Sequence, residues 1–453
     1  MKILVSVLLV LFLAVGWIAA LPKPNTAADV TRELEIAREQ MDMGAYGAAI
    51  NYYRRAAAKD ESLEVQLQLL DAYETTGKLK EAKALLKTLL DKARPNMTAE
   101  PELMVLYGRL ADLYAQSGEW QAYIDLAREA CGVSREYFDR ELSERYFAEK
   151  YRPTDTSTEL LLAGGFIGNL AVAVTVDGAY YVNERIKVVS GPYHEATPPL
   201  SGILAVRNME DKWQFIDTAG QLYMASEETY DRLWSGATTY VLGSRGGKYY
   251  YLNDHCREVL GPYDEACPFA NGVAAVREGG RWFIIDGTGA RLTDDNDAWT
   301  SEGFLDVRLD DFGTCSMGGR IFALTEAGWR LYDLKGKRVG SLEFRDARPF
   351  AGGGFAAVEL GDGWAFVNGS GAICCGDLRF QDARSAGPSQ LAAVKQDGLW
   401  GYILGGEWVG TTQIASWRMV IAPQYEDAGV FSANGLAPVK TNGSWHYIRL
   451  QNI

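Results

Sequence analysis

Histidine is scarce in this chain, and its three copies lie far apart in the sequence. They are His194, His255 and His446. A histidine-based metal site or general base needs the imidazole beside further ligands or a second acid. Because the three copies occupy different positions of the repeats described below, the sequence predicts neither a metal site nor a histidine-dependent active site.

Two acidic motifs have the composition of known reactive sites but lack the surrounding pattern. Asp311, Phe312 and Gly313 form a tripeptide of protein kinases, yet no Gly-rich loop, strand lysine or catalytic-loop motif accompanies it. The Asp-Asp-Asn-Asp run at 294–297 offers oxygen ligands for calcium, but it lacks the glycine and distal glutamate of an EF-hand loop. We therefore expect a turn at 311–313 and a solvated loop at 294–297.

Polar residues also recur at one position of the repeats, directly after aromatic strands. They are Asn183, Asp217, Asn253, Asp286 and Asn368. Asn and Asp side chains initiate turns by accepting backbone hydrogen bonds, so turn formation is the first interpretation. The alternative is that they converge on a central channel and bind a cation or a sugar. No nucleophile elbow or phosphate-binding loop is present, so we predict no catalytic, cofactor-binding or metal-binding residues and no enzyme activity.

The six cysteines show no metal-ligand spacing. They are Cys131, Cys256, Cys267, Cys315, Cys374 and Cys375. Cys256 and Cys267 flank a predicted turn in one repeat and are the best candidates for a disulfide; the alternative is that they are small buried hydrophobic residues. In an extended backbone the adjacent Cys374 and Cys375 point to opposite faces, so we do not expect them to bridge to each other.

The elements that carry these residues repeat along the last two thirds of the chain. Aromatic residues lead short strands at intervals of about 33 to 36 residues, with two gaps of about 45 to 47. These strand starts are Tyr180, Trp213, Tyr249, Trp282, Trp329, Trp364, Trp400 and Trp445. Each unit has a strand such as Leu391 to Val394, a tight turn over Asp397 and Gly398, the aromatic strand, and a third strand before a Pro-containing corner.

This motif closely resembles the tryptophan-glycine (WG) β repeat of bacteria over about residues 165 to 453. Trp400 and Gly401 show the dipeptide in full, and Trp213, Trp282, Trp364 and Trp445 keep only the Trp. The resemblance implies no enzyme activity. Units this small cannot bury a core alone, so seven or eight copies favour a closed β-propeller, and a twisted open ribbon or solenoid is the alternative. We expect closure by pairing between the last copy and the stretch beginning at Leu160 to Leu162.

The preceding region, from about Thr31 to Ala148, has apolar residues at helical spacing. Gly44, Gly77 and Gly118 each follow a predicted helix and precede a small residue of the next one. The region resembles tetratricopeptide repeats on the residues Ala37, Gly44, Ala49, Tyr53 and Ala56; Leu70, Tyr73, Gly77, Ala82 and Leu86; and Ala111, Tyr114, Gly118, Ala122 and Ala130. The resemblance implies a concave peptide-binding groove lined by Arg38, Asp71, Glu74, Asp112 and Gln116; the alternative is that these are solvated helix-face residues.

The first residues of the chain predict its compartment. Ile3 to Ala20 is an apolar run of about 18 residues, which can just span a bilayer. Cleavage after Ala20 would place Ile18 where signal peptides carry a small residue. We therefore favour an uncleaved transmembrane anchor, with a removed signal peptide, and hence secretion, as the alternative.

Composition limits the partners. The net charge of -14 and the pI of about 4.9 argue against nucleic acid and against an anionic membrane surface. We expect a multidomain α plus all-β chain: a signal anchor or signal peptide at 1–24, helical repeats at 25–155 and the β array at 156–453. The expected function is a non-catalytic, extracytoplasmic, membrane-anchored scaffold of the cell envelope that binds protein, peptide or glycan and needs no cofactor. The alternatives are a cell-wall-directed hydrolase with carboxylates in a propeller groove and a purely structural spacer.

Overall fold

The computed structural model describes residues 24–95, 100–224, 230–236, 240–409 and 412–451. The chain forms two compact units, and the division lies between Lys150 and Tyr151. No helix within the described ranges is long and apolar enough to span a membrane. The predicted anchor or signal segment at 1–24 lies outside the described residues, apart from Pro24.

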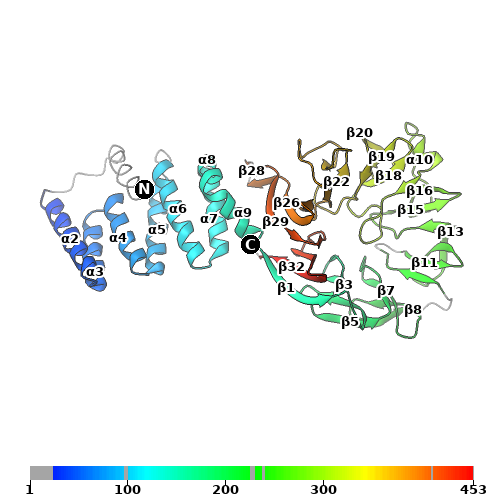
Figure 1. Cartoon of the computed structure of the whole chain (residues 1–453), viewed down its shortest axis with the longest axis horizontal. Coiled ribbons are helices and arrows are strands. Elements are labelled where there is room, and N and C mark those ends of the chain that lie inside the picture. Colours follow the sequence, from blue (N-terminus) through cyan, green and yellow to red (C-terminus); the bar gives the residue numbers. More distant parts are fainter. Residues whose placement is uncertain (1–23, 96–99, 225–229, 237–239, 410–411, 452–453) are drawn as a thin grey trace. The chain divides into compact units, whose positions relative to one another are not determined.

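The first unit consists of antiparallel helix pairs (Figure 1). The helices are α2 (Pro24–Asp42), α3 (Tyr46–Lys59), α4 (Leu63–Thr75), α5 (Leu79–Ala93), α6 (Glu100–Gln116) and α7 (Trp120–Val133), followed by α8 (Arg135–Tyr137), a π-helical turn η1 (Phe138–Leu142) and α9 (Ser143–Lys150). Gly44, Gly77 and Gly118 join the pairs with φ of 73°, 71° and 67°, the left-handed conformation that glycine adopts without steric cost. The predicted helical hairpins are therefore confirmed.

The second unit is an eight-bladed β-propeller. Blade 1 is β2 (Leu162–Ala163), β3 (Leu170–Thr175), β4 (Gly178–Asn183) and β5 (Val188–Tyr193); blade 2 is β6 (Glu195–Ala196), β7 (Ile203–Arg207), β8 (Trp213–Asp217) and β9 (Leu222–Met224); blade 3 is β10 (Arg232–Trp234), β11 (Val241–Arg245), β12 (Lys248–Leu252) and β13 (Glu258–Tyr263); blade 4 is β14 (Glu265–Ala266), β15 (Val273–Glu278) and β16 (Arg281–Asp286).

The remaining four blades follow the same order. Blade 5 is β17 (Asp306–Val307), β18 (Ile321–Thr325), β19 (Gly328–Tyr332) and β20 (Arg338–Phe344); blade 6 is β21 (Asp346–Ala347), β22 (Phe355–Glu359) and β23 (Trp364–Asn368); blade 7 is β24 (Asp382–Ala383), β25 (Leu391–Gln396), β26 (Leu399–Leu404) and β29 (Arg418–Tyr425); blade 8 is β30 (Asp427–Ala428), β31 (Leu436–Thr441), β32 (Ser444–Leu450) and β1 (Pro153–Leu160).

Two insertions account for the long gaps between aromatic strand starts. A short helix, α10 (Trp299–Glu302), lies between blades 4 and 5, and a hairpin of β27 (Glu407–Val409) and β28 (Thr412–Ala415) lies within blade 7. Residues outside regular strands border the third strands of blades 4 and 6 through isolated bridges such as Trp282 to Phe304 and Trp364 to Phe380.

Strand β1 closes the ring, so the propeller and not the open ribbon is observed. It runs antiparallel to β32, with Pro153 opposite Leu450 and Thr156 opposite Tyr447 (Figure 1). The predicted closing stretch is confirmed at Leu160, which pairs with Trp445, but most of the closing strand is the polar segment before it, and Leu162 belongs to blade 1. Strand β1 also begins three residues before the predicted start of the array at 156.

In the third strand of each blade, the residue two positions after the leading aromatic is buried. In blade 7 the exposed fractions of Trp400 and Tyr402 are 5% and 0%. The predicted start in blade 1 is wrong by one residue, because Ala179 pairs with Tyr193 as Trp400 pairs with Tyr425. Tyr180 therefore lies on the opposite face of its strand from the leading aromatics of the other blades.

Tyrosine hydroxyls at this buried position bond to the next blade. Tyr181, Tyr251 and Tyr402 donate to the carbonyls of Thr197, Cys267 and Gly429 at 2.7 to 2.9 Å. Tyr447 donates in the same way to Gly164 at 2.8 Å and so joins blade 8 to blade 1. A buried hydroxyl needs a partner, and this one adds a directional contact between blades.

Candidate functional site

Polar contacts connect the successive first helices of the pairs, on which the predicted groove residues lie. Arg38 on α2 donates to Gln68 on α4 at 3.0 Å. Arg109 on α6 reaches back to both Asp71 and Glu74 on α4, at 2.5 and 2.7 Å. The carboxylates, together, outweigh the effect of burial and raise the pKa of the Arg109 guanidinium.

The series continues to the last helix of the unit. Asp112 on α6 pairs with Arg145 on α9 at 2.8 Å, whereas Gln116 lies exposed at the end of α6. Four of the five predicted groove residues are therefore in contacts that connect neighbouring helices. Such pairs are half-exposed and contribute little each, but they fix the spacing of the helices.

A groove of about 530 Å³ runs along α6. Its lining residues are Pro101, Met104, Val105, Gly108, Arg109 and Asp112 from α6, and Ser134, Glu136, Tyr137 and Arg140 from the segment after α7. The α6 positions recur at three- and four-residue spacing and so form one stripe of the helix. The floor is mostly apolar, and Val105 is 39% exposed to solvent.

The break in the last helix positions the other wall. Ser134 accepts a hydrogen bond from the backbone N–H of Tyr137 and begins the short α8. The π-helical turn η1 follows, in which each backbone hydrogen bond spans one residue more than in an α-helix. The side chains of Phe138 and Leu142 in this turn are buried. The Tyr137 hydroxyl lies so close to α6 that a Cβ at Gly108 would be 2.6 Å from it. Gly108 therefore allows Tyr137 to line the groove, and burial raises the pKa of Tyr137.

Acidic groups exceed basic ones around the groove. Among the charged lining residues and their ion-pair partners, the acids are Asp71, Glu74, Asp112, Glu136 and Glu141, and the cations are Arg109, Arg140 and Arg145. The Glu136 side chain is 90% exposed. The rim therefore carries a negative potential, although the arginines are close by.

The predicted groove residues and the observed groove overlap in one residue, Asp112. Asp71 and Glu74 act on it indirectly by holding Arg109. Sequence reasoning missed Met104, Val105, Gly108 and Tyr137. The sequence did contain one signal. On the face of α6 that was expected to be polar, the apolar residues Met104 and Val105 are followed by Gly108.

The recurring Asn and Asp residues of the propeller form turns. Asn183, for example, accepts backbone N–H bonds from Arg185 and Lys187 at 2.9 and 3.2 Å. Asp217, Asn253, Asp286 and Asn368 accept the same two bonds in their own turns. Each side chain is therefore used in the turn after the third strand of its blade, which agrees with the first interpretation, and none belongs to a group of metal ligands among the described residues.

The loop of the kinase-like tripeptide crosses the propeller. Residues 309–314, called the channel strap here, follow the first strand of blade 5. A Cβ at Gly165 of blade 1, the opposite blade, would lie 3.2 Å from the Phe312 ring. Asp311 lies 3.6 Å from Arg384 of blade 7. The strap is a turn, as predicted: Asp310 accepts backbone bonds from Phe312 and Thr314 at 3.0 and 2.9 Å.

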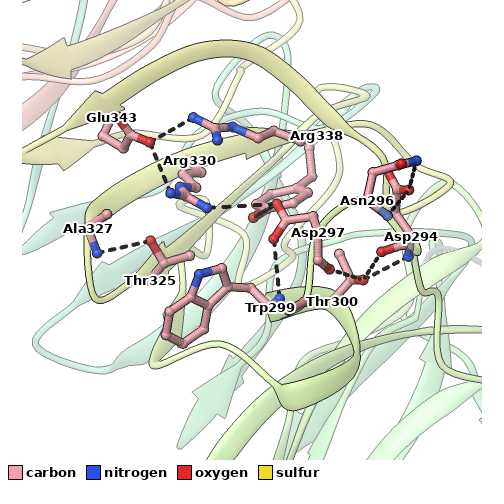
Figure 2. A network of polar contacts seen from close by, with 12 residues as sticks. Asp294, Asn296, Asp297, Trp299, Thr300, Thr325, Ala327, Arg330, Arg338 and Glu343 are labelled. Carbon is pink, nitrogen blue, oxygen red and sulfur yellow. Dashed lines mark hydrogen bonds and ion pairs between the residues drawn. The ribbon is translucent and has the colours of Figure 1, made fainter.

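The Asp-Asp-Asn-Asp run is not a solvated loop throughout, because Asp297 is buried. Figure 2 shows the polar contacts around it. The Tyr332 hydroxyl and the Trp299 backbone donate to its carboxylate at 2.9 and 3.2 Å. Arg330 lies 3.9 Å from Asp297 and 3.0 Å from Glu343, which Arg338 also pairs with. Burial and Asp297 raise the pKa of Tyr332. The network fastens the insertion after blade 4 to blade 5, and no group of metal ligands forms among the described residues.

Arginine, tryptophan and aspartate form a recurring contact, called the inter-blade clamp here. Arg308, Arg348 and Arg384 lie over the leading Trp329, Trp364 and Trp400 of their own blades, with ring centroids at 4.3, 4.9 and 5.5 Å. Each also reaches an aspartate of the next blade: Arg308 pairs with Asp346, Arg348 with Asp382 at 2.8 Å, and Arg384 with Asp427 at 2.9 Å. The clamps tie blades 5 to 8 together.

Each histidine lies near a different aspartate. His194 contacts Asp211 at 2.5 Å, and His255 and His446 lie 3.9 Å from Asp254 and Asp155. Cys256 and Cys267, the best candidates for a disulfide, are both free: Cys267 packs in one hydrophobic cluster with Cys315, whereas Cys256 packs against the cluster between blades 2 and 3.

Family models match both units. A WG-containing repeat matches residues 263–282, 329–364 and 418–445, and a tetratricopeptide repeat matches 40–100. The chain is a WG-repeat protein with tetratricopeptide-like helices. This confirms both resemblances, and such units commonly serve as protein-interaction scaffolds. The repeated Trp of the motif carries the arginine of the inter-blade clamp at Trp329, Trp364 and Trp400.

Comparison with solved structures gives only distant similarity to this WG-repeat chain. A eukaryotic initiation factor is 11% identical, with 65% of this chain and 84% of that chain covered and a TM-score of 0.40. PorZ, a surface component of the type-IX secretion system of Porphyromonas gingivalis, is 11% identical over 64% of this chain and 42% of that chain, with a TM-score of 0.32. The AfRom2 CNH domain is 10% identical over 67% and 99%, with a TM-score of 0.32. A search of curated proteins gave no match.

Proposed function

We propose that this chain is a non-catalytic binding protein whose helical unit holds a peptide segment of a partner protein in the groove along α6. The single observation that carries the proposal is the solvent-open apolar floor around Val105, bordered by charged side chains. An apolar depression with a few polar groups at its edge suits a short peptide, because the floor takes an apolar side chain and the edge orients it.

The charge of the rim favours a basic peptide. Five carboxylates face three guanidinium groups around the groove, and the whole chain has a net charge of -14. A partner segment with Lys or Arg beside a Leu- or Phe-sized side chain would gain from both features. This makes protein or peptide the proposed partner in preference to a glycan.

The propeller is proposed to be the rigid support of this binding unit. The inter-blade clamps use arginines and aspartates that could otherwise contact a ligand, and the channel strap lies across blades 5, 7 and 1. Both features favour a scaffold over a ligand channel.

An extracytoplasmic, membrane-anchored location is part of the proposal and is supported by the apolar run Ile3 to Ala20. Alkaline carbonate extraction tests it: an anchored chain stays with the membrane pellet and retains its N-terminal residues, whereas a chain cleaved near Ala20 is released.

Selection of random 12-residue peptides against the full chain tests the binding proposal. Selected peptides are expected to be basic and to carry an apolar residue. Val105→Arg, which adds a cation to the floor, and Gly108→Ala, which displaces Tyr137, should each weaken their binding by about tenfold or more.

Two matched variants control for charge and for helix effects. Val176→Arg changes a valine that is 85% exposed on the propeller, and Gly132→Ala adds a Cβ to α7 with nothing within 4 Å. Binding should be unchanged in both. A selection without binders, or binders indifferent to Val105→Arg and Gly108→Ala in variants with native circular dichroism, would overturn the proposal.

A further inference from the structure

Cys267 and Cys315 come from different blades and lie in one buried core. Cys267 directly follows the first strand of blade 4, and Cys315 directly follows the channel strap of blade 5. Each is 1% exposed, and both belong to the same hydrophobic cluster with Tyr251 and Ile321. They are therefore neighbours through packing although about 50 residues separate them in the sequence.

Hydrogen bonds hold the two segments against each other. The Ser316 hydroxyl donates to the Ala270 carbonyl at 2.7 Å. Asn271 donates from its side chain to the carbonyls of Ser316 and Met317 at 2.8 and 3.0 Å. Because these three bonds start one residue beyond Cys315 and three residues beyond Cys267, the backbones on both sides are fixed where the thiols meet.

The thiols influence each other directly. Interaction with the Cys267 thiol, and then burial, raise the pKa of the Cys315 thiol well above its usual range. The Cys267 sulfur also accepts the Ala275 backbone N–H at 3.2 Å, which fixes its side-chain orientation. Both cysteines are free in the structure, so a bond between them requires the two sulfur atoms to approach to the S–S bond length of about 2.05 Å.

We propose that Cys267 and Cys315 form a disulfide that fastens the root of the channel strap to blade 4. The oxidant is the disulfide of an oxidised dithiol or of oxidised glutathione. One thiolate attacks that disulfide and displaces a thiolate from it; the second cysteine then attacks the mixed disulfide and displaces the other thiolate. The two cysteines lose two protons and two electrons, and the oxidant is reduced to two thiols.

Burial determines when this exchange takes place. A thiol with a raised pKa and no solvent exposure is a poor nucleophile, so the folded protein resists oxidation. The exchange therefore belongs to folding, before the segments around Cys267 and Cys315 pack.

Refolding of the full chain in detergent, with a mixture of reduced and oxidised glutathione, tests the proposal. Trypsin separates the relevant cysteines, since Cys256 lies in peptide 249–257, Cys267 in 258–277 and Cys315 in 309–320. After refolding we expect peptides 258–277 and 309–320 to be linked, with a mass two hydrogen atoms below the sum of the two peptide masses. The folded, reduced chain, given the same treatment, should yield much less of this linked pair.

Variants separate this pairing from others. Cys256→Ser should leave the linked pair unchanged, whereas Cys267→Ser and Cys315→Ser should abolish it. The oxidised chain should also unfold at a Tm higher by roughly 5 °C than the reduced chain, a difference lost in Cys315→Ser. Linkage of Cys267 to Cys256, or no linkage after refolding to native circular dichroism, would overturn the proposal without bearing on the peptide groove.

Discussion

At the scale of single residues, the inter-blade clamp explains why a tryptophan leads the third strand. The Trp364 ring is 9% exposed and lies under Arg348, whose other contact is Asp382 on the next blade. A planar guanidinium can stack on a ring and reach a carboxylate at once, which an ammonium cannot do as well. The tryptophan therefore contributes both to its own blade and to the junction with the next.

Arg348→Ala is expected to lower the free energy of unfolding by about 1 to 2 kcal/mol, because it removes a cation-π contact and a half-exposed ion pair. Urea unfolding measures it, and a double-mutant cycle with Asp382→Ala isolates the pair. The same cycle on Lys212 and Glu210, both 75% exposed, should give a coupling energy near zero. Equal coupling energies in the two cycles would mean that the clamp is an ordinary surface pair.

Asp310 in the channel strap gives a pH dependence with a defined sign. Burial raises the pKa of its carboxyl to about 6, from an ordinary 3.8, although hydrogen bonds from Thr314 and Phe312 act in the opposite direction. The folded chain therefore binds this proton more tightly than the unfolded chain. The stabilising contribution of the proton is complete below a pH of about 4 and is lost as the pH rises through about 6.

Asp310→Asn should remove this dependence, since the amide carries no charge at any pH. The free energy of unfolding of the parent chain minus that of Asp310→Asn is expected to fall between pH about 4 and about 6 and to stay constant above. Asp177→Asn, at an exposed carboxylate in a turn of blade 1, controls for a change in net charge. A difference that rises over this interval would contradict the assignment.

At the scale of elements, strand β1 is held by a short ladder. The Gln451 N–H donates to the Arg152 carbonyl at 3.2 Å. Hydrogen-bonded residue pairs alternate with non-bonded pairs along antiparallel strands. Thr154 and Thr156 are therefore the next residues of β1 that are hydrogen-bonded to β32. The register then shifts between Thr156 and Leu160, and Thr158, which lies in the shifted part, has no opposite residue on β32. Two threonines of one strand thus differ in what they contribute to closure.

Thr154→Pro should destabilise the propeller by about 1 to 3 kcal/mol, because proline lacks the N–H that the ladder uses. Thr158→Pro, in the unpaired part of the same strand, should cost much less. Thermal unfolding followed by tryptophan fluorescence compares them. If both prolines lowered the Tm equally, backbone rigidity and not the lost closure bond would be responsible.

At the scale of the whole molecule, the architecture could be predicted where a local pattern repeats. Gly44, Gly77 and Gly118 indicated the helix pairs because each needs a left-handed backbone, and the aromatic strand starts indicated the blades. The closing strand could not be predicted in the same way. Residues 153–160 are mostly polar, since one edge of β1 pairs and most of its side chains face solvent. Their partner is almost 300 residues away.

The candidate site was only partly predictable for a related reason. The resemblance placed Asp71, Glu74 and Asp112 on the concave face, but the groove depends on the break of the last helix at η1 and on the approach of Tyr137 to Gly108. Burial of Asp297 likewise depends on Tyr332 and Arg330 from the next blade. These features depend on packing between segments and leave no periodic signal in either segment alone.

Closure by β1 also sets an order of events during synthesis. The strand that completes blade 8 leaves the ribosome before any other strand of the propeller, and its partner β32 is made last. At about 5 to 20 residues per second, β1 is without its partner for roughly 15 to 60 s. Its polar sequence keeps an exposed, unpaired edge from associating with other nascent chains during that interval. A chain that ended before residue 444 would lack β32, so β1 would have no partner and the ring would stay open.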